Sequence, residues 1–150
     1  MVSREVIVSF IRNHLLGKVE TCMMEMEKAQ ESANAEEKSS AGDKYETGRA
    51  MSQQQRDFFA KRLDNALTEL AVFDAVSNFA PGGKIRAGSL IRSGNQYFFV
   101  GSGIGMLTLP AGEKLICTST DSPFGKSLLG KGPGDEFRFA GNNIRIEMLL

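Results

Sequence analysis

Ala80-Pro81-Gly82-Gly83 divides this sequence of 150 residues into two parts of different composition. Residues 1–80 contain three glycines and no proline, whereas residues 81–150 contain thirteen glycines and all four prolines. Glycine and proline destabilise helix interiors, so we expect long helices before this joint and strands and turns after it. The sequence therefore predicts an α+β protein with two domains, residues 1–80 and 81–150.

Residues 1–80 carry two apolar series with the three- and four-residue spacing of amphipathic helices. The first series runs from Ile7 to Ala33 and the second from Met51 to Phe73. Between them lies Ser39-Ser40-Ala41-Gly42-Asp43, where the glycine suits the end of one helix and the aspartate the start of the next. Two narrow apolar stripes joined by a tight reversal predict an antiparallel coiled-coil hairpin.

Residues 81–150 show short apolar runs separated by turn residues, which is typical of a small sheet. The expected strands are 89–92, 96–100, 105–109, 114–118, 136–139 and 144–149, with a hairpin turn at Ala140-Gly141-Asn142-Asn143. A short helix is expected over residues 122–130, because Ser122 suits an N-cap, Pro123 the first helical position and Gly130 the end. This part is therefore predicted to be a compact β-rich module.

The composition of the whole chain excludes several classes of protein. Eighteen basic residues balance eighteen acidic ones, so the chain lacks the net positive charge of proteins that coat nucleic acid or anionic membranes. Cys22 and Cys117 match no ligand spacing, and His14 falls on the first apolar stripe, where we expect it to pack between the helices. No apolar run approaches the roughly 18 residues that span a bilayer, so we expect a cytoplasmic protein without a membrane partner.

Two motifs of this chain resemble those of the Gre family of bacterial transcript-cleavage factors. The first, at the expected tip of the hairpin, is Gly42-Asp43-Lys44-Tyr45-Glu46. The second and more specific one is Asp121-Ser122-Pro123-Phe124-Gly125-Lys126-Ser127-Leu128-Leu129-Gly130-Lys131-Gly132-Pro133-Gly134-Asp135. The resemblance spans both parts of the chain and implies that the β-rich module has an FKBP-like fold.

The same resemblance implies a transcription elongation factor that binds RNA polymerase through Asp121, Ser122 and Pro123. The hairpin tip would enter the secondary channel of the polymerase, where Asp43 and Glu46 help to hold a Mg²⁺ ion shared with the polymerase. The polymerase's own cleavage of backtracked RNA would then be stimulated, so the chain would not be a free-standing enzyme. Its partners would be RNA polymerase and the 3′ end of the nascent RNA, and we expect a monomer.

The residues of the tip are consistent with this chemistry. Asp43 and Glu46 are three residues apart at an expected helix start, which places both carboxylates on one face. Carboxylate oxygens suit Mg²⁺, but two of them cannot fill its octahedral shell, so a partner must supply the rest. An alternative stays open, because Asp43 also suits a helix cap and Glu46 a first helical turn, a role that needs no metal.

Three more residues near the tip are candidate contacts with RNA or polymerase. Tyr45 stands at an apex without a local core, so it can either stack on a base or fold back over the tip. Arg49 and Arg56 are seven residues apart and share a helix face with Gln53. That face fits RNA phosphates, as a basic patch does in the Gre family, and it fits an ordinary solvent-exposed face as well.

Two other functions remain as alternatives. After the tip motif the chain has Thr47-Gly48-Arg49-Ala50, where the Gre family has Asn and an acidic residue beside an aromatic one. This departure leaves open a regulator of RNA polymerase without cleavage activity. The less favoured alternative is an FKBP-like prolyl isomerase or chaperone, which needs an aromatic-lined pocket. We expect the core of the module to use up its aromatic residues instead.

Overall fold

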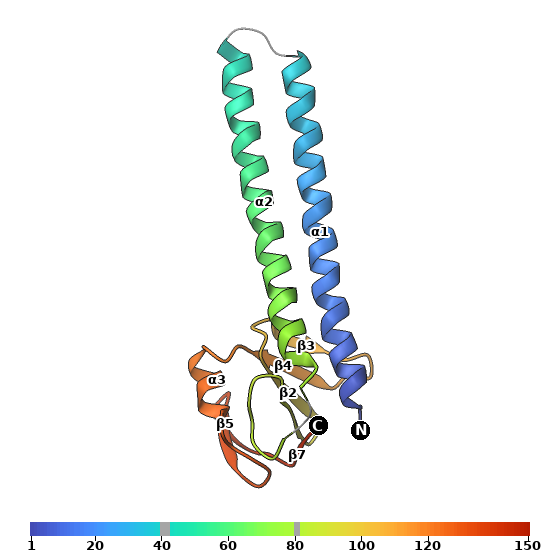
Figure 1. Ribbon diagram of the computed structural model, residues 1–150, viewed down its shortest axis with the longest axis vertical. Helices are drawn as coiled ribbons and strands as arrows, with labels where there is room; N and C mark the ends of the chain where they lie inside the picture. The colour runs from blue at the N-terminus through green and yellow to red at the C-terminus, as the bar shows by residue number, and fades with distance from the viewer. Residues whose placement is uncertain (40–42, 80–81) are drawn as a thin grey trace. The chain divides into compact units, whose positions relative to one another are not determined.

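A computed structural model describes the backbone of residues 1–39, 43–79 and 82–150, and the side chains of residues 1–35, 48–79 and 82–150. Two long helices come first, α1 (Arg4–Ser39) and α2 (Asp43–Ser77). They lie side by side and run in opposite directions (Figure 1). The predicted helical hairpin is therefore confirmed, and so is the start of its second helix at Asp43.

The two helices pack through a seam with regular spacing. Buried or half-buried residues of α2 recur in alternating steps of four and three, as in a coiled coil: Ser52, Arg56, Phe59, Leu63, Ala66, Leu70 and Phe73. The buried residues that α1 contributes are Ile7, Ile11, Leu15, Val19, Cys22, Ala29 and Ala33. Ion pairs of 2.9 Å between Lys18 and Glu69 and of 3.4 Å between Arg62 and Glu25 bridge the helices in antiparallel register.

The sequence predicts His14 in this seam, and that prediction is wrong because its side chain is exposed. The buried residues of α1 follow one another in steps of four at this point, from Ile11 to Leu15 and on to Val19. A residue three positions after Ile11 therefore falls beside the stripe and not on it.

The chain forms two compact units. One is Asn13–Leu70, and the other joins Met1–Arg12 to Ala71–Leu150. The second unit thus contains the first turns of α1, the last turns of α2 and the whole β-rich module. The domain boundary predicted at residue 80 falls on residues outside the described ranges and stays a prediction.

The β-rich module is built on a five-stranded sheet in the order β3-β4-β2-β1-β7. Its strands are β1 (Leu90–Ser93), β2 (Gln96–Val100), β3 (Gly105–Thr108), β4 (Lys114–Thr118) and β7 (Met148–Leu149). The central strands β2 and β4 are parallel, and the other pairs are antiparallel. The first four strands agree with the predicted ones to within a residue at either end.

Both faces of the central strand β2 are buried. Phe98 belongs to a core cluster whose other members are Ile85, Ile91, Val100, Ile116, Leu128, Phe137 and Ile146. Its neighbour Phe99 packs instead against Phe73 of α2, with ring centres 5.3 Å apart. The uninterrupted apolar run of this strand therefore reflects a sheet that is covered on both sides.

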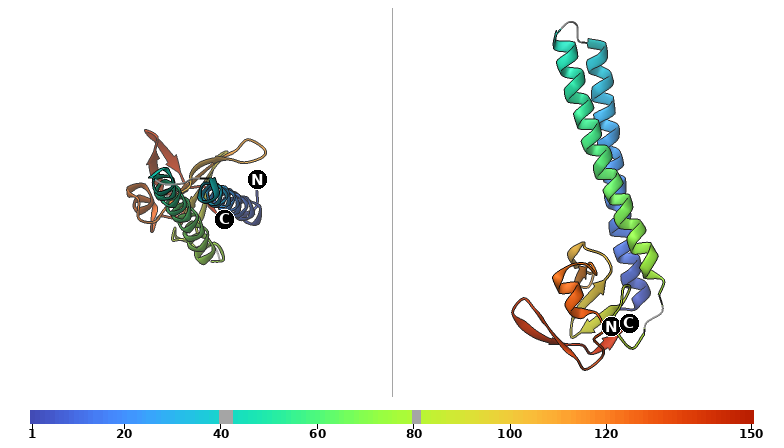
Figure 2. Two further views of the ribbon diagram at one scale, coloured as in Figure 1. Left: turned by 90° about the horizontal axis from the view of Figure 1, so that it is seen from above. Right: turned by 60° about the vertical axis from the view of Figure 1, so that its left-hand side comes forward.

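Strands β5 (Glu136–Phe139) and β6 (Asn142–Arg145) form a separate two-stranded hairpin, which stands out from the main sheet in Figure 2. The predicted four-residue turn and the predicted single strand over residues 144–149 are both wrong. Ala140 and Gly141 alone form the turn, with φ of 51° and 81°, as a tight hairpin requires. The chain then leaves the hairpin at Ile146, which is fully buried, so residues 148–149 join the main sheet as β7.

Candidate functional site

The Asp121-Ser122-Pro123 segment lies at the start of helix α3 (Pro123–Leu128). Ser122 is the N-cap residue, and its Oγ accepts a hydrogen bond of 3.0 Å from the backbone N–H of Gly125. Pro123 occupies the first turn, where a missing N–H costs no helical hydrogen bond. Gly130 follows the C-cap residue with φ of 85°, which confirms the predicted cap at each end of this helix.

A network of hydroxyl groups holds this segment in place. The Oγ of Ser122 lies 2.8 Å from Oγ1 of Thr118 and donates a hydrogen bond of 3.0 Å to the carbonyl oxygen of Ser119. In return, Oγ of Ser119 accepts a hydrogen bond of 3.2 Å from the backbone N–H of Ser122. Asp121 and Pro123 remain exposed on either side. The result is a rigid, capped helix end that presents two side chains to solvent.

Thr118 and Ser119 are residues that the sequence analysis does not single out. The available signal was the run Thr118-Ser119-Thr120-Asp121-Ser122 directly before a proline, since hydroxyl side chains so placed commonly bond to the nearby backbone. The sequence indicates a cap at Ser122 but not the two residues that fix its orientation.

The predicted metal ligands belong to the first turn of α2. Asp43 is the first residue of this helix, so residues 43 and 46 belong to one turn, as expected. The side chains of Asp43, Tyr45 and Glu46 lie outside the described residues, and their predicted roles stay predictions. Among the side chains that are described, no three or more His, Cys, Asp or Glu residues gather where they could hold a metal ion.

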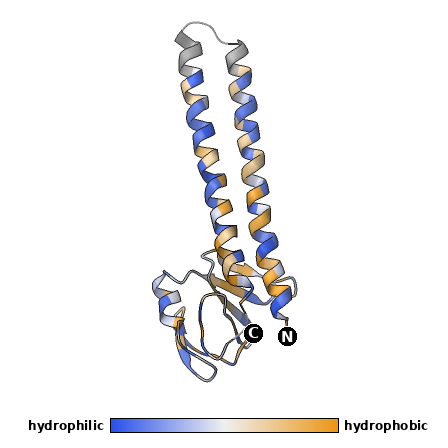
Figure 3. Cartoon of the chain, viewed as in Figure 1, coloured by the Kyte–Doolittle hydropathy of each residue, from blue (hydrophilic) through white to orange (hydrophobic). Residues whose placement is uncertain are grey.

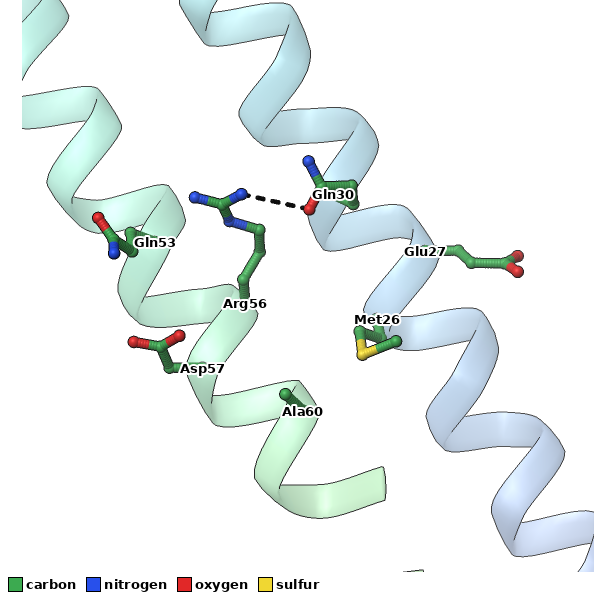
Figure 4. A pocket seen from close by; sticks show the side chains of 7 residues that line it. All are labelled: Met26, Glu27, Gln30, Gln53, Arg56, Asp57 and Ala60. Carbon is green, nitrogen blue, oxygen red and sulfur yellow. Dashed lines mark hydrogen bonds between the residues drawn. The ribbon is translucent and has the colours of Figure 1, made fainter. Parts of the chain in front are cut away.

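Arg49 and Arg56 lie in different environments. Arg49 is exposed, whereas Arg56 is half-buried and its Nη1 donates a hydrogen bond of 3.3 Å to Oε1 of Gln30 on the other helix (Figure 4). The two arginines therefore do not form one open basic strip, contrary to the sequence-based expectation. The missed signal is the seven-residue spacing from Arg56 to Leu63 and on to Leu70, which assigns Arg56 to the seam.

A hollow of about 490 Å³ lies beside Arg56 between the two helices. The residues that line it are Met26, Glu27, Gln30, Gln53, Arg56, Asp57 and Ala60 (Figure 4). The Nε atom of Arg56 is buried and has no hydrogen-bond partner among the described residues. Most of these lining residues are exposed, so the hollow is an open groove on the surface of the hairpin, and a polar group of the adjacent seam is left unsatisfied.

The aromatic residues of the module lie in its core or pack against it, as expected. Phe98 is fully buried, with ring centres 5.0 Å from Phe137 and 5.4 Å from Phe139. Phe124 is only partly buried, and together with Phe137 it lines a surface hollow of about 570 Å³ whose edge includes Lys131. The expectation that the core takes up most of the aromatic residues is confirmed, since Phe124 and Phe139 also pack against it, and only a shallow hollow beside Phe124 and Phe137 remains at the surface.

Cys117 is not available as a nucleophile. It lies in β4 and is buried, and burial raises the pKa of its thiol to about 12. A thiol with this pKa stays protonated at neutral pH, whereas reactive cysteines have a lowered pKa.

Comparisons of the chain with models of protein families, with curated proteins and with solved structures gave no match. None of the helices in the described part of the chain is both long and apolar enough to cross a membrane. Function is therefore inferred from the two motifs and from the geometry around them.

Proposed function

We propose that this chain is a Gre-like transcription elongation factor of bacteria. It binds RNA polymerase through the start of α3, inserts its helical hairpin into the secondary channel and stimulates the polymerase's own cleavage of backtracked RNA. In this proposal the β-rich module has an FKBP-like fold, and the protein acts as a monomer in the cytoplasm. The chain is not a free-standing nuclease, because the polymerase supplies most of the catalytic site.

The observation that carries the proposal is the capped start of α3. Asp121-Ser122-Pro123, the first residues of the more specific Gre-like motif, coincide with a helix end that side-chain hydroxyls hold in place. A surface that is already ordered loses little conformational entropy on binding. Exposed Asp121 and Pro123 are the proposed contacts with the polymerase, and Ser122 holds them in position.

The hairpin supports the second part of the proposal. Because α2 begins at Asp43, Asp43 and Glu46 occupy the turn where the helix dipole favours carboxylates. These two residues would hold one side of a Mg²⁺ ion, whose remaining ligands come from the polymerase. The ion would supply charge stabilisation for phosphodiester hydrolysis. Tyr45 and exposed Arg49 are the proposed contacts with the RNA, whereas Arg56 is less suited because it faces α1.

A pull-down with RNA polymerase, followed by a cleavage assay on a backtracked complex, tests the proposal. The wild-type protein is expected to bind the polymerase and to accelerate cleavage. Asp43→Asn is expected to bind equally well and to lose the acceleration, because Asn still caps a helix but carries no charge. Equal acceleration by both proteins would show that Asp43 is only a cap.

A regulator without cleavage activity is the second candidate. The sequence Thr47-Gly48-Arg49-Ala50, which departs from the Gre pattern, favours it. In that case the wild-type protein would bind the polymerase in the pull-down but leave the rate of cleavage unchanged.

The hollow lined by Phe124 and Phe137 favours prolyl isomerase activity as a third candidate. An aromatic-lined hollow of about this size can accept a prolyl side chain. The test is the rate of cis–trans isomerisation of a short peptide that contains Ala-Pro. The catalysed rate should be lost in Phe124→Ala if the hollow is the active site, and the candidate fails if the wild-type protein gives no acceleration.

A further inference from the structure

The seam between the helices changes in character along the unit Asn13–Leu70. We call residues 13–22 with 63–70 the base segment, and residues 26–35 with 48–60 the distal segment. In the base segment Val19, Cys22 and Ala66 form a buried cluster, against which Leu63 and Leu70 pack. The buried residues of the distal segment are small, namely Ala29, Ala33 and Ser52, and its larger seam residues Met26, Arg56 and Phe59 are only half-buried. Figure 3 shows the same trend, because orange apolar residues thin out along both helices toward the end where they are joined.

Arg56 marks the change from one segment to the other. It occupies the heptad position that Leu63 and Leu70 occupy one and two heptads later. Its Nη1 donates a hydrogen bond of 3.3 Å to Gln30 of α1, and its buried Nε lacks a partner among the described residues. A buried N–H without an acceptor destabilises the closed state. The neighbouring hollow of about 490 Å³ is open to solvent and lined mainly by exposed residues, so water reaches the helices beside Arg56.

Ion pairs between the helices also stabilise the base segment more than the distal segment. Lys18 pairs with Glu69 at 2.9 Å, and Glu25 pairs with Arg62 at 3.4 Å just outside the distal segment. Among its described side chains, the distal segment contributes no ion pair across the seam. Since helices of this length depend on packing between their apolar faces, the two segments must differ in local stability.

We propose that the distal segment opens independently of the base segment and that Arg56 keeps it weak. Opening here means local separation or unwinding of the paired helices, while the base segment stays closed. It allows the spacing of the helices to change along the distal segment without unfolding the protein. This property belongs to the chain alone, so its test requires no polymerase.

Native-state hydrogen exchange on the full chain measures this opening directly. In the wild-type protein we expect the amides of residues 29–33 and 52–56 to show at least about tenfold less protection than those of residues 15–22 and 63–70. Arg56→Leu restores an apolar seam residue, so it is expected to raise the protection of the distal amides about tenfold and to leave the base amides unchanged. Equal protection of both segments in the wild-type protein would overturn the proposal, as would no response to Arg56→Leu.

Lys61→Leu is the matched control. Lys61 is exposed on the same helix, so this substitution adds the same apolar side chain without reaching the seam. We expect exchange in both segments to match that of the wild-type protein. If Lys61→Leu protected the distal amides as strongly as Arg56→Leu, the effect would come from helix propensity or surface hydrophobicity, and the role assigned to Arg56 would be wrong.

Discussion

Gly125 lies so close to the backbone carbonyl oxygen of Ser119 that a Cβ atom at position 125 would collide with it. This close approach brings the N–H of Gly125 within 3.0 Å of Oγ of Ser122, which is the capping bond of α3. The glycine is needed here for space. Gly125 therefore allows the start of α3, which is proposed to bind RNA polymerase, to pack against the chain just after β4.

Gly125→Ala is predicted to displace the start of α3 and to destabilise the protein. The added methyl group meets backbone and not a flexible side chain, so we expect a loss of about 1–3 kcal/mol in the free energy of unfolding. Urea unfolding followed by circular dichroism measures it. Lys126→Ala, an exposed change in the same helix, should stay within about 0.5 kcal/mol of the wild-type protein. Equal urea midpoints for Gly125→Ala and the wild-type protein would mean that the backbone at Ser119 moves aside without cost.

Replacing Asp121 and Pro123 together by Ala is predicted to weaken the affinity for RNA polymerase about tenfold or more, since both exposed side chains at the proposed contact are lost. The fold should survive, because Ser122 and its hydroxyl network are untouched. Binding of the labelled protein to core polymerase measures the effect, with Lys114→Ala, an exposed change in β4, as the control. Unchanged affinity in a folded double variant would place the contact elsewhere.

Arg4 is predicted to stabilise the unit in which the helix ends meet the sheet. Its guanidinium donates to the carbonyl oxygens of Ser77 and Leu150 at 2.9 and 3.1 Å, and the two termini lie side by side in Figure 2. Arg4→Leu removes two charged hydrogen bonds, so it should lower the free energy of unfolding by about 2–3 kcal/mol.

Arg12→Leu is the control for Arg4, because the ion pair of Arg12 with Asp74 is exposed to solvent and should be worth less than about 1 kcal/mol. Both variants are compared with the wild-type protein in urea. An equal loss in the two variants would show that the carbonyl contacts of Arg4 add nothing beyond surface charge.

Structure that depends on neighbouring residues could be predicted from the sequence. The hairpin helices follow from their apolar spacing, and the cap of α3 follows from Ser122 and Pro123, since the capping bond spans only three residues. The start of α2 at Asp43 could also be predicted, because it depends on the neighbouring Gly42 and Asp43. The position of the proposed polymerase-binding site could be predicted because a helix cap depends only on residues that are close in the sequence.

Structure that depends on distant partners could not be predicted in this way. The sequence predicts an open face for Arg56, because a charged residue is normally solvated, but Arg56 bonds to Gln30 on the facing helix. The sequence predicts a continuous strand through Ile146, but its N–H donates to the carbonyl oxygen of Asp135 and its side chain lies in the core. In both cases the deciding contact comes from another part of the chain.

Cys117 is predicted to lower the stability of the protein at alkaline pH. Burial raises the pKa of its thiol from 9.0 to about 12, so above pH 9 the unfolded chain loses a proton that the folded chain keeps. The free energy of unfolding therefore falls as the pH rises from 9 toward 12, with a slope approaching about 1.4 kcal/mol per pH unit from this group. Urea unfolding at pH 8, 9 and 10 measures the slope.

Cys117→Ala isolates this contribution, because the other titrating groups are common to both proteins. The stability difference between the wild-type protein and Cys117→Ala should shrink between pH 8 and pH 10. A difference that stays constant over this range would show that the thiol ionises equally in the folded and unfolded states.

Asp43 and Glu46 are predicted to act as one unit in the stimulated cleavage of RNA. If both carboxylates bind the same Mg²⁺ ion, losing either one leaves half a chelate, and removing the second costs little more. Asp43→Asn and Glu46→Gln should each abolish most of the stimulation, and the double variant should lie within about twofold of the weaker single variant. The rate of cleavage in a backtracked complex is measured at saturating protein. Lys61→Ala, an exposed change in the same helix, serves as the control and should keep the stimulation. If the losses multiply in the double variant, the two residues act independently and a shared metal ion is excluded.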